Sequence, residues 1–131
     1  MPVTPAPKRA DRFEDPAAYM PLTPLAFHIL LAVSDRPLHG YAIIQDIEQR
    51  TDGAMHLRSG TLYTAIHRLE TDRLIRRTEK RPDDERDDER RRYYEVTPLG
   101  QRVARLESGR LAAMLSTARS RDLYHQLEPG E

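Results

Sequence analysis

The segment from Ser59 to Leu69, SGTLYTAIHRL, combines hydroxyl, imidazole and guanidinium groups at helical spacing. In a helix, its apolar side chains would share one buried face: Leu62, Ala65, Ile66 and Leu69. The outward face would carry small, polar and basic residues: Gly60, Thr64, His67, Arg68 and Thr71. Such a face suits the phosphates and base edges of a DNA major groove better than a protein core. Taken alone, the segment also fits an ordinary amphipathic surface helix.

Within this segment, four outward side chains are the expected DNA contacts: Thr61, Thr64, His67 and Arg68. Arg68 is long enough for a bidentate contact with guanine, although a surface ion pair with Asp72 is the alternative. Ser59 is predicted to cap the helix, because its hydroxyl can accept from unpaired amides of the first turn, beside a phosphate. Tyr63 lies at the edge of the outward face. We favour a phosphate contact for its hydroxyl over packing in the core.

The chain has 131 residues, which fits one domain, and its 21 basic and 21 acidic residues give a formal net charge of zero. Zero net charge argues against a nucleic-acid partner only if the charges are mixed evenly. They are not: residues 56–81 hold seven Lys or Arg and three acids, a local charge of 7 − 3 = +4. Residues 1–55 hold five basic and seven acidic residues, a charge of −2. The basic charge therefore coincides with the candidate helix.

The sequence also predicts where the protein works and which chemistry it lacks. No apolar run approaches 18 residues, so no membrane-spanning helix and no membrane partner are expected. The absence of cysteine fits a reducing cytoplasm, where we expect the protein to reside. The five histidines are scattered without metal-site spacing, so no metal, no cofactor and no metal sensor of the ArsR type are expected. No phosphate loop or nucleophile motif is present, and we expect no enzyme.

Helix signals and turn signals divide the chain into a series of elements. Thr23-Pro24 and Thr97-Pro98 each pair a capping residue with proline at the first helical position. We expect helices at about 24–33, 40–50 and 59–71, strands at 74–78 and 92–96, and a last helix from 98 to 127. The expected organisation is a flexible arm (1–21, with a helical turn near 16–20), a winged helix-turn-helix domain (22–97), a dimerisation helix (98–127) and a frayed tail (128–131). The fold class is mainly α with a small two-stranded β wing.

The wing, the hairpin formed by the two strands, is expected to meet DNA through its returning strand. Arg90, Arg91 and Arg92 there are predicted to contact the phosphate backbone, and Tyr41 in the second helix to approach a phosphate. The tip, Asp83 to Arg90, is unusually acidic, which places its own DNA contact in doubt. Tyr93 and Tyr94 should alternate, one in the core and one exposed.

The last helix carries an apolar stripe that no remaining element of the chain can cover. The stripe consists of Leu111, Met114, Leu115 and Ala118. A two-fold homodimer would bury it and would set two recognition helices for a palindromic site in double-stranded DNA.

Four groups of residues then occur in an order and spacing that resemble the PadR family of bacterial transcriptional regulators. They are Leu38-His39-Gly40-Tyr41, Ser59-Gly60-Thr61-Leu62-Tyr63 (followed by Arg68-Leu69-Glu70 and Leu74-Ile75), Arg90-Arg91-Arg92-Tyr93-Tyr94, and Thr97-Pro98-Leu99-Gly100. The resemblance covers about residues 24–105. One departure is Thr64, where the family usually has proline.

This resemblance implies a homodimeric repressor that is released from DNA by a small aromatic or drug-like effector, and whose last helix packs near the partner's N-terminal helices. The effector-binding residues stay unknown. Two alternatives remain open: a winged-helix protein-interaction module without sequence-specific DNA binding, and a MarR-like regulator, for which the chain has too few residues.

Overall fold

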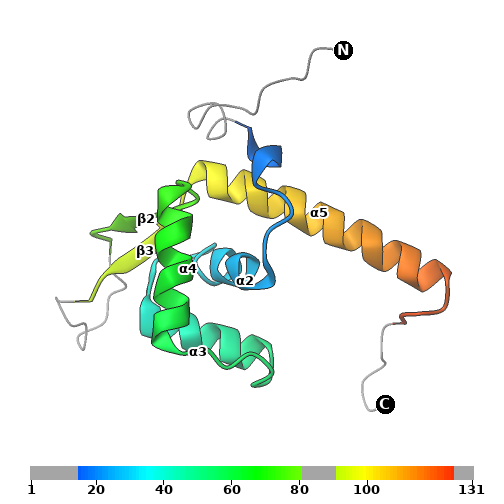
Figure 1. Ribbon diagram of the computed structural model, residues 1–131, viewed down its shortest axis with the longest axis horizontal. Coiled ribbons are helices and arrows are strands. Elements are labelled where there is room, and N and C mark those ends of the chain that lie inside the picture. Colours follow the sequence, from blue (N-terminus) through cyan, green and yellow to red (C-terminus); the bar gives the residue numbers. More distant parts are fainter. Residues whose placement is uncertain (1–14, 81–90, 126–131) are drawn as a thin grey trace.

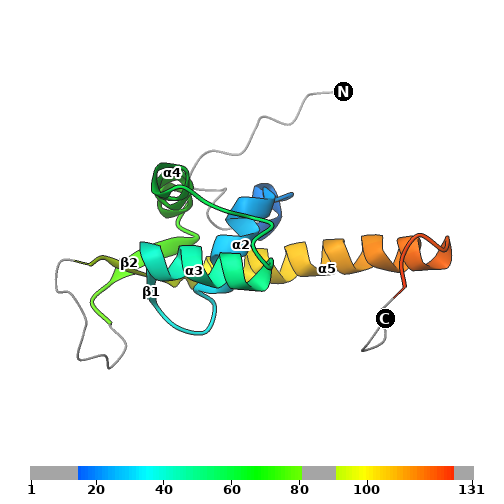
Figure 2. The same cartoon turned by 90° about the horizontal axis from the view of Figure 1, so that it is seen from below.

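A computed structural model describes residues 15–80 and 91–125. Within these ranges the elements are η1 (Pro16–Tyr19), α2 (Pro24–Ala32), β1 (Leu38–His39), α3 (Gly40–Arg50), α4 (Ser59–Thr71), β2 (Ile75–Thr78), β3 (Tyr93–Val96) and α5 (Pro98–Ser120). Helices α2, α3 and α4 gather beside the small sheet, and α5 runs along the long axis and extends beyond them (Figures 1 and 2). This is the predicted class: mainly α, with a winged helix-turn-helix and a long C-terminal helix.

Both threonine–proline pairs begin helices as the sequence predicts. The Thr23 hydroxyl accepts from the Ala26 amide at 3.1 Å, and the Thr97 hydroxyl accepts from the Gly100 amide at 3.0 Å. Thr97 Oγ1 also donates to the Arg73 carbonyl at 2.7 Å. The second cap therefore ties the start of α5 to the chain that enters the wing.

The sheet has one strand more than the sequence analysis predicted. Its order is β1-β3-β2, with both pairs antiparallel, and β1 pairs Leu38 with Tyr94 and His39 with Tyr93. The expectation that one of Tyr93 and Tyr94 is exposed was wrong, because both are buried. Tyr94 belongs to the hydrophobic core, and the ring of His39 on β1 packs edge-on against Tyr93 at 5.3 Å between centroids. The added strand thus covers the tyrosine that a two-stranded hairpin would expose.

A single core lies between α2, α3, α4, the sheet and the first turns of α5. Its most enclosed side chains are Ile29, Leu30, Ile43, Ile47, Leu62, Ile66, Leu74, Ile75 and Val103. Gly100 brings α5 close to this core, because a Cβ there would overlap the Leu74 carbonyl and approach the Val96 side chain. No residue larger than glycine fits at this point without moving the backbone.

Glu107 is a fully buried carboxylate in the middle of α5. It accepts a hydrogen bond from the Leu22 amide, in the segment between η1 and α2, and another from Arg110 Nε. The hydrogen bond from Arg110 is the main cause that holds the pKa of Glu107 below its ordinary value; burial opposes it, and the Leu22 amide adds to the lowering. The carboxylate therefore joins the N-terminal segment to α5.

Beyond Glu107, α5 leaves the body of the protein (Figure 1). It ends at Ser120, earlier than the expected residue 127, because Asp122 adopts a left-handed φ of 59° and the Leu123 amide returns to the Ala118 carbonyl at 2.9 Å. Of the helices in the described ranges, none has both the length and the apolar character that crossing a membrane requires.

Candidate nucleic-acid interface

Helix α4 presents the two faces that its sequence predicts. Leu62, Ile66 and Leu69 are buried against the body, and Ala65 is partly buried. The opposite side chains are all exposed: Gly60, Thr64, His67, Arg68 and Thr71. Figure 2 shows α4 end-on, standing out from the body formed by α2, α3 and α5. The exposed face of α4 is therefore accessible to a large partner such as double-stranded DNA.

The N-terminus of α4 differs from the prediction. Ser59 is the first helical residue and not the cap; the cap position is held by Arg58, whose backbone is extended (φ −82°, ψ 148°). No side chain caps this end of α4. The first-turn amides are therefore left without the capping partner expected from Ser59, and such amides favour a phosphate through hydrogen bonding and the helix dipole.

Tyr63 is partly packed and partly exposed. Its ring lies directly against Gly40 at the start of α3, where a Cβ would overlap the phenol. The side chain nevertheless stays 48% exposed, and the neighbouring Tyr41 is 61% exposed. The contact with Gly40 fixes the ring at the junction of α3 and α4, while part of the phenol remains accessible to a ligand.

Between α4 and the wing lies a cleft of about 480 Å³, which we call the wing-side cleft. It is lined by Gly60, Tyr63, Thr64, Ile66, His67, Glu70, Arg77, Arg92 and Tyr94. Two arginines and a histidine face a single carboxylate, Glu70, which lies 3.4 Å from Arg77 Nε. Burial raises the pKa of Tyr94, and the charge of Glu70 adds to this effect, so its phenol remains a neutral hydrogen-bond donor. The cleft has the composition of an anion site.

Arg77 was not among the predicted site residues. The sequence contains one signal for it, the +4 charge of residues 56–81, but this window does not distinguish Arg77 from its neighbours. The register of the sheet distinguishes Arg77 from Arg76. Arg77 pairs with Tyr94, whereas Arg76 pairs with Glu95 and donates to its carboxylate at 2.9 Å. Arg77 therefore turns toward α4, and Arg76 belongs to a separate ion pair.

The three consecutive arginines of the returning strand have different surroundings. Arg92 lines the wing-side cleft, and Arg91 Nη1 lies 3.2 Å from His39 Nε2. Arg90 and the acidic tip lie outside the described residues. Of the two arginines that the structure describes, Arg92 lies beside α4 and Arg91 lies against the strand β1.

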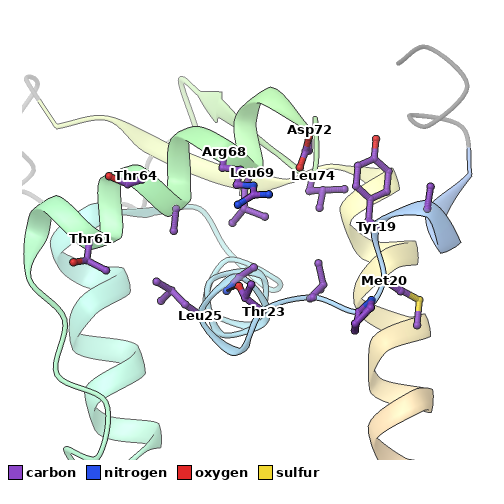
Figure 3. A pocket seen from close by; sticks show the side chains of 15 residues that line it. Tyr19, Met20, Thr23, Leu25, Thr61, Thr64, Arg68, Leu69, Asp72 and Leu74 are labelled. Atoms are coloured by element: carbon purple, nitrogen blue, oxygen red, sulfur yellow. Dashed lines mark hydrogen bonds between the residues drawn. The ribbon is translucent and has the colours of Figure 1, made fainter. Parts of the chain in front are cut away.

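A second cleft, of about 600 Å³, borders the other flank of α4; we call it the α2-side cleft (Figure 3). The wall supplied by α4 and the chain after it consists of Thr61, Thr64, Ala65, Arg68, Leu69, Asp72 and Leu74. The opposite wall runs from Ala18 through Ala26. In the described part of the chain, Arg68 forms no ion pair with Asp72 or with any other residue, so the alternative of a surface pair does not hold.

The hydroxyls of α4 are partly engaged within the helix. Thr64 Oγ1 donates to the Gly60 carbonyl at 2.9 Å, and Thr71 Oγ1 donates to the His67 carbonyl at 3.0 Å. Both threonines remain exposed. They therefore offer a methyl group and acceptor lone pairs to a partner.

The predicted dimer stripe lies on the part of α5 that leaves the body. Met114 is 57% and Leu115 49% exposed, while Leu111 and Ala118 are partly buried. Leu106, five residues before Leu111, is also exposed. No element within residues 15–80 and 91–125 covers Met114 or Leu115.

In the same ranges, no three His, Asp or Glu side chains are grouped to hold a metal ion.

The three-helix core, the exposed α4 and the adjoining hairpin define a winged helix-turn-helix protein. The sequence model of the "Transcriptional regulator PadR-like family" matches residues 29–106. This is more than half of the chain, which therefore belongs to this family of DNA-binding transcriptional regulators.

Two curated proteins are similar in sequence. An uncharacterized 37.1 kDa protein in a transposon of Streptomyces fradiae is 36% identical over 86 residues, which are 66% of this chain and 22% of that protein. An uncharacterized protein X of Lysinibacillus sphaericus is 35% identical over 72 residues, or 55% of this chain and 63% of that protein. The chain thus spans about a fifth of the first relative and less than two thirds of the second.

Solved structures share the fold. A transcriptional regulator from Clostridium thermocellum matches with 25% identity and a TM-score of 0.60, over 73% of this chain and 87% of that one. A PadR family transcription regulator from Clostridium difficile matches with 21% identity and a TM-score of 0.61, over 73% and 95%. A PadR-like transcriptional regulator from Bacillus cereus matches with 22% identity and a TM-score of 0.61, over 78% and 93%.

Proposed function

We propose that this protein is a homodimeric repressor that binds a palindromic operator by inserting α4 into the major groove. The observation that carries the proposal is the exposed face of α4, on which Arg68 has no ion pair among the described residues, with a cleft lined by two arginines beside it. A helix in the groove and a hairpin on the backbone is the docking geometry of winged helices.

The side chains divide into two groups by the contacts they would make. Arg68, with Thr61, Thr64 and His67, would read base edges, because these side chains point away from the core of the protein. The other contacts would be to phosphates and would come from Tyr41, Tyr63, Arg77, Arg92 and the first-turn amides of α4. Arg91 would join the phosphate contacts only after leaving His39.

The homodimer is supported by the apolar side chains of α5. Met114 and Leu115 expose apolar surface on a helix that has left the body of its own chain, and a second copy would cover it. Release by an effector follows from a ligand that binds the free protein more tightly than the DNA-bound one.

The test is binding to the DNA upstream of the protein's own gene and of the adjacent gene, at about 50 mM and about 200 mM salt. Wild type is expected to prefer one fragment over a shuffled fragment of equal length. Arg68→Ala should lose about tenfold to hundredfold affinity for that fragment and little for the shuffled one, since a bidentate base contact contributes roughly 1–3 kcal/mol. If wild type and Arg68→Ala bind every sequence equally weakly, sequence-specific repression is excluded and a protein-interaction module is favoured.

Arg36→Ala is the matched control, because Arg36 is also exposed and lies between α2 and β1. That segment lies on the side of the protein opposite α4 (Figure 2).

The homodimer is tested by sedimentation: Leu115→Glu should shift the sedimentation coefficient toward that of a monomer. Ala113→Glu, an exposed position on the other side of α5, should leave it unchanged.

A further inference from the structure

The α2-side cleft has the size and the walls of a small-molecule site. Its volume of about 600 Å³ lies within the range of ligand pockets, roughly 300–1,000 Å³. Most of its walls are apolar: Leu22, Leu25, Ala26, Ala65, Leu69 and Leu74. Three separate parts of the chain meet there, namely the η1–α2 segment, α2 and α4 (Figure 3). The cleft can therefore hold an apolar body of the size of two fused rings.

Polar side chains line the cleft on both sides: Thr61, Thr64, Arg68 and Asp72 on the side of α4, and Tyr19 and Thr23 on the opposite wall. Arg68 and Asp72 are one turn apart and both line it, yet no ion pair joins them. Figure 3 shows the Arg68 side chain hanging from α4 toward the start of α2, with Asp72 at the far end of α4. An anion beside Arg68 would meet a guanidinium that no ion pair within residues 15–80 and 91–125 engages, whereas Asp72 would oppose it only from a distance.

We propose that the α2-side cleft binds a small amphiphilic anion, with its apolar body between α2 and α4 and its carboxylate or sulfonate on Arg68. The site and its ligand class stand on the cleft alone; the consequence for regulation rests on the proposed function. Because one guanidinium cannot serve the ligand and a base at once, ligand and DNA compete for Arg68. By linkage, each then weakens the binding of the other by the same factor.

The direct test omits DNA and uses two probes with the same body. 1-Anilinonaphthalene-8-sulfonate carries a sulfonate, and N-phenyl-1-naphthylamine is its uncharged counterpart. Wild type is expected to bind the sulfonate at least about tenfold more tightly, the effect of roughly 1.4 kcal/mol. Arg68→Gln should remove this preference without affecting the fold, because Arg68 is exposed. Asp72→Asn should tighten binding of the sulfonate alone.

A second set of variants locates the probe. Leu25→Gln should weaken binding of both probes about tenfold, since it places an amide in the apolar wall. Met114→Gln on the exposed stripe of α5 should change neither. Circular dichroism confirms that each variant is folded. The proposal is overturned if both probes bind wild type equally, if Arg68→Gln leaves the preference intact, or if Met114→Gln is the variant that abolishes binding.

The link to DNA is tested separately with the protein on its preferred fragment. Adding the sulfonate should release wild type, while Leu25→Gln should bind DNA as wild type does and resist release. Binding of the probe without any preferred DNA fragment would leave the site established and the repressor proposal refuted. Sequence-specific DNA binding that the probe does not change would refute the competition and leave the repressor in place.

Discussion

The wing-side cleft and the α2-side cleft border opposite flanks of α4 and share Thr64, but they differ in chemistry. The wing-side cleft sets Arg77, Arg92 and His67 against one carboxylate, with two tyrosines in its walls. The α2-side cleft has mostly apolar walls, with one arginine, Arg68, and one aspartate, Asp72. One helix thus separates a surface suited to phosphates from a pocket suited to an apolar ligand. Arg68 is placed to take part in both functions, because it faces outward and also lines the apolar cleft.

The largest effect on stability should come from a larger side chain at Gly40, which contacts Tyr63 on the wing-side flank of α4. In Gly40→Val, the new side chain would overlap the ring of Tyr63, and overpacking of this kind costs roughly 1–3 kcal/mol. We expect a loss of about 3 kcal/mol in the free energy of unfolding and a displaced Tyr63. Urea denaturation measures the loss of stability, and a DNA-binding assay should detect the displacement of Tyr63 as weaker binding. Binding of the sulfonate probe to the α2-side cleft should persist; its loss would show that the two flanks are not independent.

A somewhat smaller effect is expected from the carboxylate that holds the α2-side flank. Glu107→Ala leaves the Leu22 amide without its acceptor, which should cost about 2 kcal/mol, in the range of hydrogen bonds to charged groups. Because Leu22 lines the α2-side cleft, probe binding should weaken, while the phosphate contacts proposed for the wing-side flank should be unaffected. An unchanged probe affinity would mean that the cleft keeps its shape without this tie.

The same carboxylate makes this part of the stability depend on pH. Its pKa is lowered in the folded protein, chiefly by the hydrogen bond from Arg110, so the folded state binds the proton less readily than the unfolded state. The contribution is fully present above the ordinary carboxyl pKa of 4.5 and is lost as the pH falls below it, through the lower pKa of the folded state. Glu107→Gln should flatten the acid limb of a stability–pH curve; a curve parallel to that of wild type would contradict this role.

The smallest effect is expected from Arg92 on the wing-side flank, and it tests whether this flank contacts phosphates. If Arg92 contacts a phosphate as proposed, Arg92→Ala should lower affinity about fivefold near 0.15 M salt for every DNA sequence, with the salt slope reduced by about 0.9. Arg76→Ala, whose arginine is paired with Glu95, is the matched control and should change the slope less. A loss confined to one DNA sequence would instead make Arg92 a base-reading residue.

Features that depend on near neighbours in the chain could be predicted from the sequence. The buried and exposed faces of α4 follow from spacing along a helix, and the caps at Thr23 and Thr97 use amides three residues away. Two local predictions were wrong. The backbone begins α4 at Ser59, one residue earlier than the capping preference suggests, and α5 ends at Ser120 instead of 127 because of the left-handed turn at Asp122.

Features that depend on distant pairing could not be predicted. The burial of Tyr93 requires β1, a two-residue strand with no periodicity of its own. The hydrogen bond between Glu107 and Leu22 joins positions 85 residues apart, and nothing in either local sequence indicates the other. Arg77 emerged only from the register of β2 against β3. Both clefts likewise arise from segments that are separated in sequence and meet only in the folded chain.

Gly100 has a consequence for the far end of α5. With 23 residues, α5 is about 34 Å long, so a tilt of about 5° at its first turn would move its last turn by about 3 Å. Gly100 lies in that first turn against the Leu74 carbonyl, and a methyl group there would force either α5 or the backbone at Leu74 to shift. A small change in the packing at Gly100, at the base of the wing, would thus become a larger displacement at the other end of α5. The close packing that glycine permits at this position therefore helps to set the direction in which the apolar end of α5 points.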